Sequence, residues 1–263
     1  PHQFLLCGDA NQIVHPNFFS WSTLKSFFYK QDGLATPAEL MRILHNNYRN
    51  AIAVTEVANR LLKLKHARFG SVDRESNYLV RSTGETSGTV LLLADTEPIT
   101  RELNQKTRQS TRFAVVVLHP EHKPAAHAHF HTPLIFSIQE AKGLEYDNII
   151  LYNFTSAAEE RFRDITRGVN VEDVRAEELR YARAREKEDK SLEMYKFHIN
   201  ALYVAVTRAV ENLYLIEANP GHRLFEVLGL QRWEERLALA EHGSSLHEGE
   251  QVGFACRLPE DLR

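Results

Sequence analysis

The chain has little cysteine and no long apolar run. Its 263 residues include two cysteines, Cys7 and Cys256, which are too few for a disulfide framework and are typical of a reducing compartment. No apolar stretch approaches the roughly 18 residues that a membrane helix needs, and the amino end lacks the pattern of a signal peptide. We therefore expect a globular, cytoplasmic protein.

The chain also has no large excess of positive or of negative charge. The 32 basic residues nearly balance the 35 acidic ones, and the net charge is −3. A surface that binds a polyanion therefore has to be local. An initiator methionine is absent too: Pro1 leads directly into the apolar run at 4–7, which resembles a buried strand entered midway. We expect a fragment of a longer protein.

Short apolar runs alternate with longer segments of helical periodicity, as in a parallel sheet flanked by helices. Two helices are expected around Tyr48 and Arg49, the first beginning at Thr36-Pro37. Residues 69–88 are rich in glycine, serine and threonine and predict a loop or a weak hairpin. Strands are predicted at 4–7, 89–94, 113–118, 134–138, 148–153 and 212–216.

A charged segment and a tail follow the predicted sheet strands. Acidic and basic residues alternate from about 155 to 198, which indicates a solvated helical insertion with a break at Gly168. Residues 221–263 form the tail and turn polar after one amphipathic stretch around Trp233.

Two segments of the amino-terminal part carry candidate binding residues. Residues 5–12 predict a strand that runs into a Gly-Asp turn, which places Gln12 beyond the carboxyl end of the strand, where parallel sheets bind ligands. Tyr48 and Arg49 place a flat ring beside a guanidinium, suited to a base and a phosphate oxygen. Taken singly, an ordinary polar turn and surface packing explain the two segments as well.

Two later segments add phosphate-directed chemistry. In residues 136–147, Lys142 and Gly143 suit a backbone that approaches a phosphate, and Glu145 can accept hydrogen bonds from a ribose, although a crossover loop is the alternative. In residues 200–209, Arg208 interrupts an apolar stretch and needs a partner. Either a carboxylate of the fold or an anionic ligand supplies it.

Together, and in this order, the four segments resemble motifs III, IV, V and VI of UvrD/Rep-type superfamily 1 DNA helicases. The resemblance covers residues 4–216, and residues 8–21 further resemble helicase-like proteins related to the tetratricopeptide and ankyrin repeat-containing group. It implies a three-layer α/β, RecA-like P-loop NTPase-type domain with a mostly parallel sheet. Residues 1–33 would end helicase domain 1A and contribute its last strand, and 34–220 would form domain 2A.

The resemblance also implies roles in ATP hydrolysis. Gln12 would contact the terminal phosphate and couple hydrolysis to DNA, and Tyr48 would stack on the adenine. Arg49 and Arg208 would reach the terminal phosphate. Glu145 would hold the ribose.

A second set of residues would contact single-stranded DNA, along which the family moves from 3' to 5'. The loop from Gln139 to Gly143, with Lys142, would face the DNA backbone. The aromatic residues that stack on bases would come from the stretch after Gln12, and the candidates are His15, Phe18, Phe19 and Trp21.

Half of the catalytic apparatus is missing from the sequence. It contains neither a Gly-x-x-x-x-Gly-Lys-Ser/Thr phosphate loop nor the Asp-Glu pair that holds Mg²⁺. ATP with Mg²⁺ would be bound mainly by the amino-terminal motor domain of the same polypeptide, and this fragment alone would be inactive. Only 90 positions (139 minus 49) separate Arg49 from Gln139, so that the accessory domain usual there is absent or reduced.

Two other functions fit the sequence. One is a motor that moves on RNA, because the phosphate chemistry is shared. The other is a scaffold that binds nucleic acid or protein and has lost hydrolysis. A metal site is a weaker hypothesis, because prolines indicate a flexible loop around the five clustered histidines, His119, His122, His127, His129 and His131.

Overall fold

The computed structural model describes residues 5–14, 21, 24, 26, 42–70, 78–84, 86–175 and 191–233, without the side chains of 191–194. The boundary expected between 33 and 34 lies outside these ranges. One compact unit runs from Pro1 to Arg232, so that it continues past residue 220. The unit that begins at Trp233 lies outside the described residues apart from Trp233 itself.

The centre of the first unit is a five-stranded sheet whose described strands are all parallel. Its strands are rich in valine, isoleucine and leucine, as strands covered on both faces require. The five strands predicted between residues 89 and 216 are confirmed. In spatial order they are β3 (Thr89–Ala94), β7 (Ala209–Glu217), β6 (Tyr146–Tyr152), β4 (Phe113–Val117) and β5 (Ile135–Ser137).

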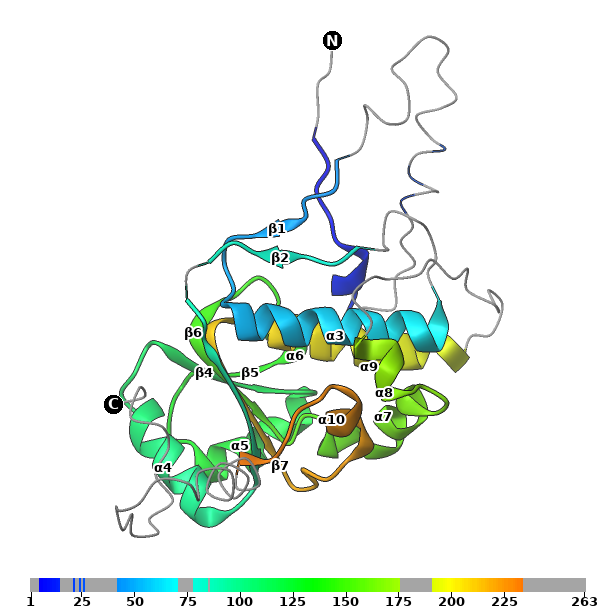
Figure 1. Ribbon diagram of the computed structural model, residues 1–263. Coiled ribbons are helices and arrows are strands. Elements are labelled where there is room, and N and C mark those ends of the chain that lie inside the picture. The colour runs from blue at the N-terminus through cyan, green and yellow to red at the C-terminus, as the bar shows by residue number, and fades with distance from the viewer. Residues whose placement is uncertain are drawn as a thin grey trace, which may run out of the picture. The chain divides into compact units, whose positions relative to one another are not determined.

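Helices cover both faces of the sheet (Figure 1). The chain crosses from β3 to β4 and β5 through α4 (Glu97–Thr107) and α5 (Lys123–His129). It returns to β6 and β7 through α6 (Ile138–Ala141), α7 (Glu159–Thr166) and α9 (Ser191–Val206). Because such crossovers are right-handed, opposite directions of travel place the two groups on opposite faces. The predicted three-layer α/β class is confirmed.

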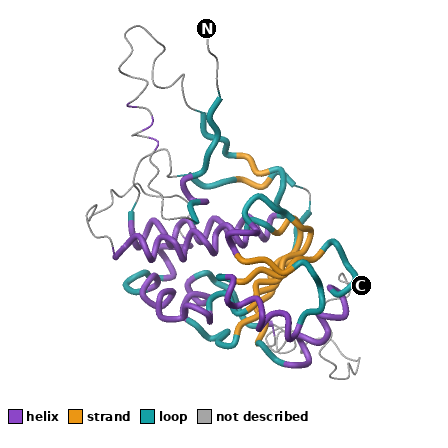
Figure 2. The backbone as a smooth tube through the Cα atoms, turned by 180° about the vertical axis from the view of Figure 1, so that it is seen from behind, coloured by secondary structure: helices purple, strands orange, loops and turns teal. Residues whose placement is uncertain are grey.

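The larger helical layer contains α3 (Ile52–Phe69), the longest helix of the described part of the chain, which lies beside α9 (Figure 2). Its side chains Leu61, Leu62 and Leu64 are among the largest fully buried ones. Helix α10 (Arg223–Val227) packs against α7 and buries Leu224 in the same core. This layer positions the segments that carry the candidate site.

The charged segment is helical, as predicted, and is broken at Gly168, whose φ is +73°. Its apolar side chains, however, belong to the main core. Phe162 of α7 is fully buried, and so is Val174 of α8 (Val171–Arg175) at 1% exposure. Only the charged face of these helices is solvated. Residues 176–190 lie outside the described part.

Two predictions for the amino-terminal part are wrong. No strand forms over residues 5–9, and Leu5 and Leu6 are 87% and 53% exposed. A strand requires a hydrogen-bonded neighbour, and the described residues provide none at this position. The helix expected before Tyr48 does not form over 42–47. Instead β1 (Asn46–Asn47) pairs in parallel with β2 (Arg81–Ser82). In the segment predicted as a loop or a weak hairpin, residues 78–80 and 83–84 are loop, and residues 71–77 and 85 lie outside the described part.

The loop predicted around the histidines is also wrong. The 3-10 helix η2 (Pro120–His122) and helix α5 occupy it, and each has a proline in its first turn. Proline at that position starts a helix, since the missing N–H has no intrahelical partner there. Pro120 and Pro124, two of the prolines that suggested a loop, therefore begin these two helices.

Candidate functional site

Arg208 lies in the turn between α9 and β7 and is 4% exposed. Its Nε donates to the carbonyl of Val204 at 3.1 Å, its Nη1 to the carbonyl of Leu144 at 3.2 Å, and its Nη2 to the hydroxyl of Thr207 at 3.3 Å. All three partners are neutral. The guanidinium is therefore fixed in direction without being neutralised.

The surroundings of Arg208 are unfavourable for its charge. Burial lowers the pKa of its guanidinium, and the nearby cation of Arg49 lowers it further, whereas Glu145 acts in the opposite direction. Arginine nevertheless stays protonated in proteins. Within the described ranges no carboxylate forms an ion pair with Arg208. The carboxylate partner that the sequence left open is thus not supplied there, and an anion would gain strongly by binding.

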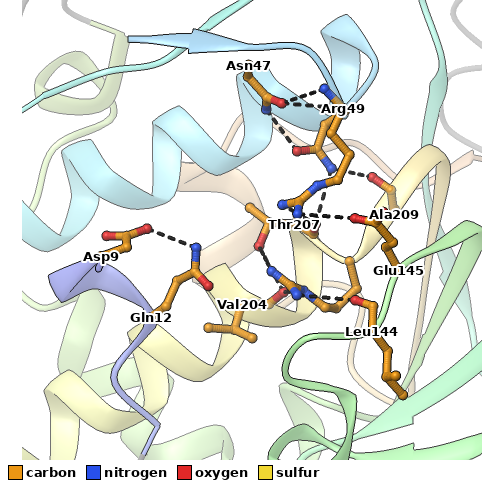
Figure 3. Close-up of polar contacts among 11 residues, drawn as sticks. Asp9, Gln12, Asn47, Arg49, Leu144, Glu145, Val204, Thr207 and Ala209 are labelled. Atoms are coloured by element: carbon orange, nitrogen blue, oxygen red, sulfur yellow. Dashed lines mark hydrogen bonds and ion pairs between the residues drawn. The ribbon is translucent and has the colours of Figure 1, made fainter. Parts of the chain in front are cut away.

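Arg49 adds a second guanidinium on the solvent side of the same turn (Figure 3). Its Nη1 lies 3.2 Å from Glu145 Oε2, and its Nη2 donates to the carbonyl of Thr207 at 3.2 Å. The side chains of Arg49 and Glu145 are 39% and 54% exposed. An exposed pair of this kind is weak and is readily exchanged for a ligand.

Asn47 and Asn50 explain why Arg49 points to this turn. The Asn47 side-chain oxygen accepts from the backbone N–H groups of Arg49 and Asn50, at 3.0 and 3.1 Å. Asn50 is 2% exposed, and its Nδ2 donates to the carbonyls of Thr207 and Ala209 at 3.1 and 2.6 Å. Neither role was predicted from the sequence. The feature that could have indicated them is an asparagine at each end of a four-residue turn, where its side chain bonds to nearby backbone.

The strand register brings Glu145 and Arg208 together. Tyr146 and Ala209 are partners at the start of β6 and β7, so that the residues directly before them are neighbours. Gly143 turns the chain ahead of β6 with φ +90°, a left-handed conformation that glycine adopts without strain. The arginines, Glu145 and Gly143 therefore gather at the amino ends of these strands.

Gln12 lies in η1 (Ala10–Gln12), apart from the arginine pair. Its Nε2 donates to Asp9 Oδ2 at 3.0 Å, and Asp9 Oδ1 accepts from the Tyr78 hydroxyl at 3.2 Å. Figure 3 shows the Asp9–Gln12 pair separated from the contacts of Arg49 and Glu145. No described strand precedes Gln12, contrary to expectation.

Tyr203 of α9 is buried at 5% exposure and interacts electrostatically with both groups. Its pKa is raised chiefly by burial and then by the charge of Asp9, while the cations of Arg49 and Arg208 oppose the rise. Its side chain is therefore within electrostatic range of Asp9 and of the two arginines. Tyr203 was not predicted from the sequence, because a tyrosine in an apolar helix is typical of core packing.

The structure brings the remaining predicted residues less closely together. Tyr48 is 78% exposed beside Arg49, and Lys142 is exposed after α6. In α6, Gln139 Oε1 is buried with no hydrogen-bond partner among the described residues. Trp21 is half-buried. The other base-stacking candidates, His15, Phe18 and Phe19, lie outside the described residues.

The five clustered histidines make several separate contacts. His119 stacks on Phe197 with the ring planes 6° apart, and His129 lies against Tyr152. His131 hydrogen-bonds to Asn104. No group of three potential metal ligands occurs in the described ranges. The helices described there also include none that is both long and apolar enough to cross a membrane.

The fold and the site define a three-layer α/β domain in which two arginines, one of them buried, meet at one turn. No protein-family model matches the chain. Over 253 residues it is 27% identical to human TPR and ankyrin repeat-containing protein 1, a match that covers 83% of this chain and 8% of that protein. The chain thus spans a small part of that relative. A solved C-terminal domain of a possible DNA helicase from Lactobacillus plantarum WCFS1 is 16% identical, with a TM-score of 0.32, over 65% of this chain and 87% of the other.

Proposed function

We propose that the chain is domain 2A of a UvrD/Rep-type superfamily 1 helicase or translocase. With a first motor domain in the same polypeptide it couples ATP hydrolysis to movement on single-stranded DNA, from 3' to 5'. The observation that carries the proposal is the convergence of Arg49 and Arg208 on one turn, where Arg208 is buried among neutral partners. Two such cations suit a triphosphate.

The residues around the arginines fit the other parts of ATP. Tyr48 is exposed directly beside Arg49 and offers a ring to the adenine. Glu145 is half-exposed and can exchange its ion pair with Arg49 for the ribose hydroxyls. Gly143 has no atom within 4 Å of the position of a Cβ, which leaves room for a ligand beside its backbone. When bound, ATP supplies the phosphoanhydride that is hydrolysed, with Mg²⁺ held mainly by the first motor domain.

Arg208 has the strongest predicted effect on the reaction. Its guanidinium is held in place by three hydrogen bonds and meets the terminal phosphate with little reorganisation. Arginines that stabilise charge in phosphoryl transfer contribute about 10³- to 10⁵-fold in rate. Arg49 binds the same phosphate from the solvent side. Gln12 couples this site to DNA, which Gln139 of α6 and Lys142 directly after this helix contact, together with Trp21.

The test is ATP turnover by a polypeptide that contains both motor domains, with and without single-stranded DNA. Arg208→Ala should reduce DNA-stimulated turnover at least about a hundredfold. Arg101→Ala is the matched control, since Arg101 pairs with Glu97 on the opposite helical layer. A wild type that binds DNA without turnover would leave only the scaffold function. Stimulation by RNA and not by DNA would instead show an RNA motor.

A further inference from the structure

Lys65 of α3 joins two buried amides from distant parts of the chain. Its Nζ donates to Asn11 Oδ1 and to Asn200 Oδ1, both at 2.8 Å. Asn11 and Asn200 are only 2% and 6% exposed, and Lys65 is itself partly buried. The contacts connect η1, α3 and α9 at one point.

The amide of Asn200 makes a second contact with the amino-terminal segment. Its Nδ2 donates to the carbonyl of Ile13 at 3.1 Å. Asn11 and Ile13 flank Gln12, so that the chain is held on both sides of this residue. Val14 continues into the hydrophobic core at 2% exposure. The backbone of Gln12 is thereby fixed, while its side chain reaches Asp9.

Helix α9 connects these contacts to the arginine site. Asn200 lies in its middle, and Arg208 follows its carboxyl end. A hydrogen-bonded helix transmits position with little change in length. The distance from the Gln12 backbone to Arg208 is therefore set through Asn200 and Lys65.

Asn11 depends on Lys65 for its orientation. Its Nδ2 is buried and has no hydrogen-bond partner among the described residues. The 2.8 Å contact of Oδ1 with Lys65 therefore helps to fix the amide, together with the interaction of Asn11 with Tyr78. Without the ammonium group, the buried Oδ1 of Asn11 would lose this partner, and unsatisfied buried polar groups are strongly disfavoured.

We propose that Lys65 is a positioning residue that keeps Gln12 at a fixed place relative to Arg208 by binding Asn11 and Asn200. The inference rests on the proposed function, in which Gln12 couples DNA to ATP hydrolysis. Lys65 touches neither the nucleotide nor DNA in this account. It acts through Gln12.

A double-mutant cycle tests the proposal in the polypeptide with both motor domains. Lys65→Met, which removes the ammonium and keeps an unbranched side chain that is one heavy atom shorter, should lower DNA-stimulated kcat about tenfold or more, because small misplacements are costly in catalysis. The KM for ATP should change less than about twofold, since the residue binds no nucleotide. In a Gln12→Ala background the same change should cost less than about twofold. Lys65→Arg should recover part of the loss.

An equal loss in both backgrounds would overturn the proposal, because Lys65 would then act independently of Gln12. A lower melting temperature with unchanged kcat would overturn it as well, since that is the result of a purely structural role. Arg101→Met is the control for removal of a cation from the opposite layer.

Hydrogen exchange separates this proposal from the motor function. The backbone N–H of Gln12 donates to the carbonyl of Asp9 at 3.1 Å and should be protected. Lys65→Met should raise its exchange rate at least about tenfold, and Arg101→Met should not. If the wild type has no turnover but exchange responds in this way, the motor function fails and the positioning contact stands. If turnover is normal and exchange does not respond, the positioning role fails alone.

Discussion

Arg49 donates a hydrogen bond to the carbonyl oxygen of Thr207, the residue directly before Arg208, across 158 positions of sequence. The contact places two guanidinium groups on one turn, although like charges repel. Asn50 holds the same carbonyl from the buried side at 3.1 Å. The fold thus maintains a concentration of positive charge that its described carboxylates only partly offset.

Replacement of Asn50 should destabilise the domain. Asn50→Ala removes the donor to Thr207 and Ala209 and leaves two carbonyls without it, at a cost of about 1–3 kcal/mol. Asn46→Ala is the control, since its amide contacts only the exposed hydroxyl of Tyr48, and should cost less than about 0.5 kcal/mol. Urea unfolding measures both. Equal midpoints would contradict the bridging role of Asn50.

Gly88 should tolerate no side chain. Its φ is +66°, and a Cβ would lie 2.4 Å from the Ala51 Cβ and from the Glu211 carbonyl oxygen. Gly88→Ala should therefore cost about 2–5 kcal/mol through strain and overpacking. Gly168→Ala has a similar φ of +73° and open space, and should cost about 1–2 kcal/mol. Thermal unfolding would refute the argument if the two variants were equally stable.

The buried Glu217 should make stability fall as pH rises. Burial raises its pKa to about 7, although the N–H groups of Thr155 and Ser156 and the Ser156 hydroxyl favour the charged form. A carboxyl whose folded pKa exceeds its unfolded value of 4.5 contributes its full stability below pH 4.5 and loses it as the pH rises through 7.

Glu217→Gln isolates this contribution, because glutamine does not titrate. Between pH 5 and pH 8, at about the limits of the titration, the wild type should lose unfolding free energy relative to the variant. The measurement is urea unfolding of both proteins at each pH. A difference that is constant, or that grows in favour of the wild type, would show that the folded pKa is not raised.

Tyr48 should matter for nucleotide binding and not for stability. The ring is 78% exposed, and its hydroxyl accepts one bond, from Asn46 at 3.3 Å. Tyr48→Ala should leave the unfolding midpoint unchanged and weaken ATP binding roughly tenfold, whereas Tyr48→Phe keeps the stacking face and should bind normally. Titration with a fluorescent ATP analogue compares them. Normal binding by Tyr48→Ala would place the adenine elsewhere.

The sheet could be predicted because each strand is a short, continuous apolar run bounded by polar residues. The run at 89–94 became β3 with the same limits. The run at 4–7 has similar composition, yet residues 5–7 form no strand. Composition shows only that a segment is compatible with a strand. Whether the segment joins a sheet depends on a neighbouring strand with which it can pair. The apolar residues Phe162 and Ile165 of the charged segment are visible in the sequence, but the many charges around them favoured a solvated insertion over a part of the core.

For the site, the sequence predicted the arginines but not what holds them. The apolar context of Arg208 indicated a buried charge, and the structure buries it. Asn50 and Lys65 carried no such signal, because their contacts join distant parts of the chain: Thr207 lies 157 positions from Asn50, and Asn11 and Asn200 lie 54 and 135 positions from Lys65. Periodicity describes which face of a helix is buried. It contains no information on which buried amides meet.

Among the described residues the last strand in sequence, β7, is inserted between β3 and β6. Until residue 217 has left the ribosome, β3 has no partner among the described strands and β6 is paired only on its β4 side, so that the growing chain exposes unpaired strand edges. Such edges are prone to pair with other chains. During synthesis the domain is therefore exposed to such pairing until β7, which directly follows Arg208, has emerged. The arginine turn and the sheet are completed in the same step.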